Sequence, residues 1–188
     1  MVSITLNTAM SLTGLSKRTL WRRIADGQLR VHDASSGGGG SDQTRVLLDD
    51  VIALSRLRVD DDDRALIVEA DAGSAEAQCD LGLLLLAQNR PTEAVAWFTR
   101  AANQAYPEAM HQLGRCYLAG RGLDASEVFG VEWISRAAAL GHRTARPMAR
   151  YLMDPGRPRV DAAALEARID AIEREQVMTV LRETADGN

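Results

Sequence analysis

The first sixty residues hold two short blocks in which apolar positions recur at helical spacing. The first block places Leu6, Ala9 and Met10 on one side of a helix. Gly14 follows this block and can take the left-handed conformation that turns a chain after a helix. Ser16 can then cap a second helix over 16–26, whose buried side carries Leu20 and Ile24. The pattern therefore predicts a helix, a tight turn and a second helix.

Two segments after the second helix have the composition of strands. Residues 29–32 and 44–48 contain Val and Leu in partial alternation with polar positions, which predicts a β-hairpin. The loop between them includes Gly37 to Ser41, a stretch with the composition of a flexible linker that is longer than a hairpin tip needs. It fits a natural tip and an engineered insertion equally. A third helix, begun by Asp49 or Asp50, is predicted to follow.

Positive charge is concentrated at this end of the chain, although the protein of 188 residues has a net charge of −4. Residues 1–60 carry eight Lys and Arg against six Asp, a net +2, and the remaining residues carry a net −6. On the second helix, basic side chains surround the apolar stripe. A polyanion is therefore expected to meet this end of the molecule first.

The run G-L-S-K-R-T-L-W-R-R-I-A-D-G-Q-L-R, followed by the hairpin and by L-L-D-D-V-I-A-L, resembles the winged helix-turn-helix domain of the MerR and excisionase type. The resemblance covers about the first third of the chain. It implies that the second helix enters the major groove of double-stranded DNA, where Arg can bind guanine with two hydrogen bonds, and that the hairpin wing touches the backbone or the minor groove. Carried over by position, the implied DNA-binding residues are Lys17, Arg18, Thr19, Arg22 and Arg23 on the helix, with Arg30 and Arg45 on the wing.

The rest of the chain begins with a short acidic break at 59–63, which predicts a linker, and then repeats itself. The pair Leu81-Gly82 recurs as Leu113-Gly114, a shift of 32, whereas the segment around Trp97 recurs around Trp133, a shift of 36. The difference of four residues predicts an insertion between the two helices of the second unit, within the glycine-containing segment 119–123. Residues 65–72 and 144–152 complete the array as flanking half-units. Small residues at the helix crossings predict close helix packing.

The motifs A-x-x-x-L-G-x-x-Y-x-x-G-x-G and W-x-x-x-A-A-x-x-G-H, which run from Ala109 to His142, resemble the SEL-one-like repeat, a relative of the tetratricopeptide repeat. This resemblance implies a curved surface for an unidentified protein partner, and it implies no reaction. His111 and His142 are explained as repeat positions, and we do not expect them to be metal ligands.

A final helix is predicted from about Asp161 to Thr184, with Leu165, Ile169 and Ile172 on its apolar side. Two interpretations stay open. The helix caps the open end of the repeat array, as short solenoids require, or it forms a homodimer, as the C-terminal helix of MerR-type regulators does.

Together these patterns predict a mainly α-helical bacterial protein: a winged helix-turn-helix with a small β-hairpin at 1–58, the acidic linker at 59–63, a short α-solenoid of repeats at 64–152, and a C-terminal capping or dimerisation helix within 153–188. The predicted function is a DNA-binding transcriptional regulator whose repeats bind protein; the alternative is a non-enzymatic adaptor or scaffold whose head binds protein. We expect no enzymatic activity, cofactor or metal site, since no catalytic or metal-binding spacing is present. A cytoplasmic location without membrane contact is expected, because the longest apolar run is far shorter than the roughly 20 residues that span a bilayer.

Overall fold

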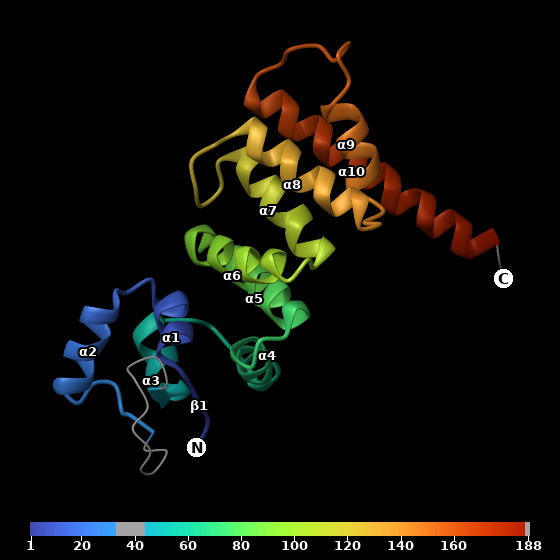
Figure 1. The fold of residues 1–188 in the computed structure, drawn as a ribbon. Helices are drawn as coiled ribbons and strands as arrows, with labels where there is room; N and C mark the ends of the chain where they lie inside the picture. Colours follow the sequence, from blue (N-terminus) through green and yellow to red (C-terminus); the bar gives the residue numbers. More distant parts are fainter. Residues whose placement is uncertain (33–43, 187–188) are drawn as a thin grey trace. The chain divides into compact units, whose positions relative to one another are not determined.

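The computed structural model describes residues 1–32 and 44–186, and the predicted loop at Gly37 to Ser41 lies outside them. The described chain forms ten helices and two short strands, so it is mainly helical as predicted (Figure 1). It divides into two compact units, Met1–Arg100 and Ala101–Asn188, which are described separately below.

The first unit begins with two short helices joined by a tight turn, as the hydrophobic pattern predicted. Helices α1 (Leu6–Thr13) and α2 (Lys17–Ala25) are joined by Gly14 at φ +67°, whose N–H donates to Met10 O. Ser16 caps α2 by accepting from Thr19 N at 3.2 Å. Leu6, Ala9 and Leu20 are buried as predicted, together with Leu12. Met10 and Ile24, which were also predicted on the buried sides, are only half-buried.

The small sheet differs from the predicted hairpin. Strand β2 (Arg45–Leu47) pairs antiparallel with β1 (Ser3–Thr5), a strand that the sequence did not predict because it is only three residues long and runs directly into α1. The segment 29–32 lies along β2 and contributes a single bridge, Val31 with Val46, between two backbone hydrogen bonds. The predicted strand at 29–32 is therefore reduced to a bridge, and the N-terminal strand forms the main pairing.

The structure also corrects two predictions for the segments that follow the sheet, the start of the third helix and the acidic linker. Helix α3 (Leu48–Ser55) begins before Asp49 and Asp50, which lie in its first turn and do not cap it. The predicted linker at 59–63 is the start of α4 (Asp61–Asp71): Asp60 accepts from Asp63 N at 2.9 Å and donates its own N–H to Asp63 Oδ2 at 3.1 Å. Carboxylates satisfy the free N–H groups of a first helical turn and are favoured by its dipole, so the acidic run forms a helix start.

The repeat helices follow the predicted spacing. Helices α5 (Ala75–Ala87) and α6 (Pro91–Asn103) recur as α7 (Pro107–Ala119) and α8 (Glu127–Ala139), with starts shifted by 32 and 36 residues. The four extra residues lie in the connection after Gly120, which takes φ +64°. Close packing at the predicted small residues is confirmed, because a Cβ atom on Gly82 would lie 2.5 Å from the Phe98 ring and one on Gly114 2.8 Å from Ile134.

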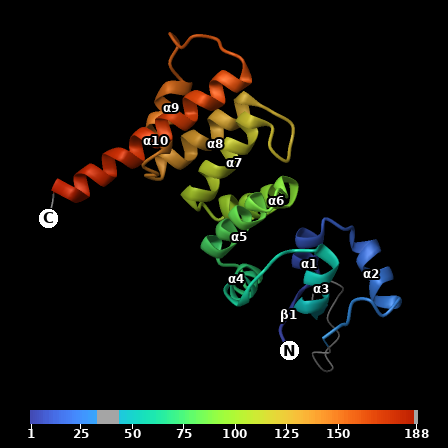
Figure 2. The same cartoon turned by 180° about the vertical axis from the view of Figure 1, so that it is seen from behind.

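The second unit ends with α9 (Ala145–Leu152) and the long helix α10 (Ala162–Asp186). The first half of α10 contacts α7 and α9 and buries Leu165, Ile169 and Ile172. Arg115 of α7 forms ion pairs with two carboxylates on this half. Figures 1 and 2 show the C-terminal end of α10 extending beyond α9. Among the described residues, no helix combines the length and the apolar character that a membrane span requires.

Candidate functional site

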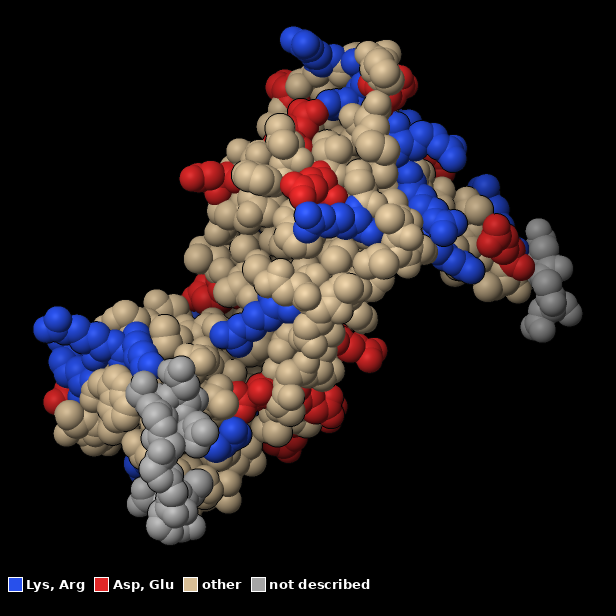
Figure 3. All heavy atoms as spheres, in the orientation of Figure 1, with Lys and Arg blue, Asp and Glu red and all other residues tan. Residues whose placement is uncertain are grey.

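The outer face of α2 carries three of the residues that surround the predicted stripe. Arg18 and Arg22 are exposed, one helical turn apart, and Trp21 beside them is 39% exposed. Neither guanidinium has a hydrogen-bond or ion-pair partner among residues 1–32 and 44–186. Figure 3 shows Lys and Arg side chains gathered over α2. This face therefore exposes two arginines and an aromatic ring to solvent.

Two other predicted contacts on α2 are engaged within the protein. Thr19 Oγ1 lies 2.9 Å from Ser16 Oγ, so this hydroxyl takes part in the helix cap. The Arg23 guanidinium donates to the side-chain oxygen of Gln28. Lys17 is only half-buried. The structure thus distinguishes the outward pair, Arg18 and Arg22, from residues that also stabilise the head.

The predicted wing arginines form ion pairs inside the first unit. Arg30 donates through Nε and Nη2 to Asp50, at 3.0 and 2.7 Å, and its backbone N–H donates to the same carboxylate at 2.8 Å. The hydrogen bond from the Arg30 side chain holds the pKa of Asp50 below its usual value. Arg45 donates to Asp71 at 3.0 Å and to Ser3 Oγ at 3.1 Å. Both guanidiniums are thus paired with carboxylates of the first unit, although the Arg30 side chain is still 62% exposed.

Asp71, at the end of α4, is the most buried member of this network, with its side chain 3% exposed. It accepts from Thr5 N at 3.0 Å, from Thr5 Oγ1 at 2.6 Å and from Arg45. Burial alone raises the pKa of Asp71, but the hydrogen bonds and the Arg45 charge outweigh it, so the pKa lies below its usual value. The carboxylate therefore fastens β1 and β2 to α4.

Two arginines of the first repeat fasten α1 in the same way. Arg90 Nη2 donates to Leu12 O at 2.7 Å, and Arg100 Nη2 donates to Ser11 Oγ at 2.7 Å. With the Asp71 contacts, these bonds explain why the head and the first repeat belong to one compact unit that ends at Arg100.

Glu108, His111 and His142 in the second unit form a cluster whose ligand atoms lie within 4.8 Å of one another. Ala145 N donates to His142 Nδ1 at 3.0 Å, so a neutral His142 carries its proton on Nε2, which donates to Glu108 Oε2 at 2.7 Å. His111, 3.7 Å from Glu108 Oε1, and His142 together hold the pKa of Glu108 well below its usual value. The cluster links the start of α7 to the start of α9.

A metal ion does not fit this arrangement of His142. An ion bound at His142 Nε2 would displace the proton from that nitrogen, and Nδ1 would then have to carry a proton and donate, as the second nitrogen of a metal-bound imidazole does. In this structure Nδ1 instead accepts from Ala145 N–H. His111 stacks on His142 with ring centroids 4.5 Å apart and is 1% exposed. The repeat motifs explain both histidines as repeat positions. They do not indicate that the two rings stack, because 31 residues separate the histidines along the chain.

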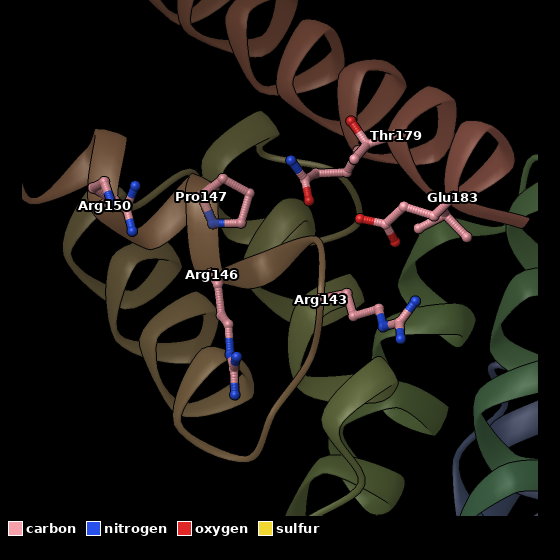
Figure 4. Close-up of a pocket in the computed structure, with 8 residues that line it drawn as sticks. Arg143, Arg146, Pro147, Arg150, Thr179 and Glu183 are labelled. Carbon is pink, nitrogen blue, oxygen red and sulfur yellow. The ribbon is translucent and has the colours of Figure 1, made fainter. Parts of the chain in front are cut away.

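A groove between α9 and α10 was also not predicted. Its larger part, about 420 Å³, lies between three arginines, Arg143, Arg146 and Arg150, and the α10 residues Gln176, Thr179, Val180 and Glu183. Figure 4 shows the arginines on one side of it and Thr179 and Glu183 on the α10 side. An adjoining hollow of about 230 Å³ shares Arg143, Gln176 and Val180 and adds Thr144, Val177 and Leu181. The groove is therefore basic towards α9. On the α10 side its larger part is mainly polar, and the adjoining hollow is apolar, lined by Val177, Val180 and Leu181.

Comparison with known proteins identifies the repeats. Residues 75–106 and 107–142 match the Sel1 repeat family model. A crystal structure of a Sel1 repeat protein from Oxalobacter formigenes is similar to 77% of this chain and 92% of its own, with 27% identity and a TM-score of 0.45. A search of curated proteins found no match. The family match does not include the head, so its similarity to MerR and excisionase domains stays a prediction. Residues 75–142 of this chain are two Sel1 repeats, as the repeat motifs predicted.

Proposed function

We propose that this chain is a non-enzymatic adaptor whose Sel1-repeat part, here the two repeats at 75–142 with the helices α9 and α10 that follow them, binds a partner protein. The observation that carries the proposal is the pair of Sel1 repeats at residues 75–142, which suggest a scaffold for protein–protein interaction. Stacked helical repeats present extended surfaces whose side chains can vary without disturbing the core between the helices. Of the two functions predicted from the sequence, this proposal is closer to the adaptor or scaffold than to the DNA-binding transcriptional regulator.

Exposed apolar side chains on the second unit support protein binding. Val128 is 77% exposed and Phe129 51% exposed in the first turn of α8, and Val177 and Leu181 are 51% and 56% exposed on α10. Adjacent apolar side chains of this size on a surface are typical of interaction sites. By contrast, burial raises the pKa of the Cys116 thiol to about 11, so this cysteine is not a nucleophile at neutral pH.

The test is capture of a partner followed by reconstitution. The tagged full chain is expressed in its host and cross-linked, and proteins enriched over a tag-only control are identified by mass spectrometry. The purified partner is then titrated into the full chain by isothermal calorimetry. We expect saturable binding whose Kd is unchanged in R18A/R22A, because those arginines lie on the head. Absence of any enriched protein that binds in purified form would show that the chain is not an adaptor.

DNA binding by the head is a second candidate function, favoured by the outward pair Arg18 and Arg22 beside Trp21 on α2. Arg30 and Arg45 each pair with a carboxylate of the same unit, so a DNA contact by either would compete with that ion pair, and their predicted contacts stay predictions. Labelled double-stranded DNA is titrated with the full chain at several salt concentrations, since binding through phosphates weakens as salt rises. If this function is correct, R18A/R22A abolishes sequence preference while R159A on the second unit leaves it unchanged. No binding at low salt rejects the function.

A further inference from the structure

We propose that the groove between α9 and α10 binds an acidic peptide segment of the partner protein, with apolar side chains seated towards α10. This inference rests on the proposed adaptor function and names the chemistry of its partner. The charge on one wall of the groove and the uncovered apolar surface on the other indicate a peptide of this kind.

The basic wall consists of arginines that have no partner of their own. Arg143, Arg146 and Arg150 are all exposed, and no described carboxylate pairs with any of them. Other arginines of the same unit do form ion pairs, including Arg115 and Arg121 with carboxylates on α10. Arg146 and Arg150 lie one turn apart on the exposed side of α9, and Arg143 lies in the turn just before this helix. All three line the groove.

The apolar wall continues the buried stripe of α10 beyond the part that other helices cover. Ile169 and Ile172 are buried, and the same side of the helix then carries Gln176 and Val180, which line the groove. Val177 and Leu181 beside them are about half exposed. Apolar surface that is not covered within the unit gains free energy when a partner removes it from water.

Charge complementarity selects an acidic occupant. The groove is lined by three arginines and one carboxylate, Glu183, so carboxylates of a bound peptide are expected on the α9 side, away from Glu183. Residues 101–188 carry eleven Arg and twelve Asp and Glu, a net charge of −1, so the unit exerts little long-range attraction on nucleic acid. The size of the groove suits two or three side chains of a peptide.

The experiment titrates the full chain into three fluorescein-labelled 12-residue peptides. One contains a Leu-Phe pair flanked by Asp and Glu; in the second the acids are replaced by Asn and Gln; in the third the Leu-Phe pair is replaced by Ser-Ser. We expect only the first to bind measurably, with an affinity that falls as salt rises. The variant R143Q/R146Q/R150Q should bind it about tenfold more weakly, which is the effect of losing three modest charge pairs.

The control is R58Q/R159Q/R174Q, which removes the same charge from three exposed arginines outside the groove. Equal weakening by both triple variants overturns the proposal, because binding would then follow net charge alone. Failure of the first peptide to bind at all also overturns it, and so does a dimer in sedimentation that R143Q/R146Q/R150Q dissociates. The adaptor function is judged separately, by whether a captured partner binds the purified chain. If the Kd of that partner is unaffected by R143Q/R146Q/R150Q, the adaptor function is supported and the proposal that the groove binds the partner is rejected.

Discussion

Replacing Asp71 by Asn tests whether the Asp71 carboxylate, with its hydrogen bonds and its ion pair to Arg45, stabilises the first unit. The Asp71 carboxylate is buried and accepts three hydrogen bonds, from Thr5 N, Thr5 Oγ1 and Arg45. Asn keeps the shape but loses the charge and turns a donor group towards these donors. Breaking a fully buried ion pair costs about 3–5 kcal/mol, but the Arg45 side chain is about a third exposed, so we expect a smaller loss of about 2–3 kcal/mol in the free energy of unfolding.

The assay is urea unfolding of the full chain followed by far-ultraviolet circular dichroism. Hydrogen exchange measured by mass spectrometry should place the loss of protection in β1 and α4. The matched control is Asp49→Asn, since Asp49 pairs with Arg64 at the surface and is 67% exposed, and its loss should cost less than about 1 kcal/mol. Equal costs for the two variants would refute the structural role of Asp71.

The stability difference between the wild type and Asp71→Asn should also depend on pH. The pKa of Asp71 is lowered in the folded state, so its stabilisation is complete above the ordinary value of about 3.9 and is lost as pH falls through the folded-state pKa. We expect a constant difference between pH 5 and pH 8, and a smaller one below pH 4. A difference that grows on acidification contradicts this account.

Three further predictions concern the second unit. Gly114→Ala should lower the free energy of unfolding by about 1–3 kcal/mol through overpacking, while Gly156→Ala, whose Cβ meets only a flexible carboxylate, should change it by less than about 0.5 kcal/mol; similar values for both contradict the packing. His142→Ala should cost about 1–2 kcal/mol through loss of its bonds to Glu108 and α9, and Zn²⁺ should not raise the Tm of the wild type; a clear rise would overturn the hydrogen-bond assignment. Cys116 should resist iodoacetamide at pH 8 until the chain is denatured, and rapid alkylation of the native chain is inconsistent with its raised pKa.

The repeat helices could be predicted from sequence because local signals agreed along the chain. The Leu-Gly and Trp motifs fix the period, and glycine at 82 and 114 marks where helices touch. The cap at Ser16 and the turn at Gly14 were also predictable, since both depend on neighbouring residues alone. These elements follow from local chemistry, so the structure confirms them.

The roles of Arg30 and Arg45 could not be predicted, because their partners are 20 and 26 residues away along the chain. In sequence they are basic residues near a hairpin, and only the fold brings Asp50 and Asp71 to them. The groove was hidden for the same reason. The spacing of Arg143, Arg146 and Arg150 is visible in the sequence, but which side of α9 remains beside α10 depends on tertiary packing.

Photo-cross-linking in cells shows whether the Sel1-repeat part binds protein. Benzoylphenylalanine is placed singly at Val177, at Phe129 and, as a control outside the groove, at the exposed Ala163 near the start of α10. Adducts of the full chain are identified by mass spectrometry. We expect a discrete protein adduct from position 177 or 129 and none from 163. An adduct from position 129 alone would support the adaptor function and contradict the proposal that the groove binds a peptide. Absence of protein adducts from both test positions would contradict the claim.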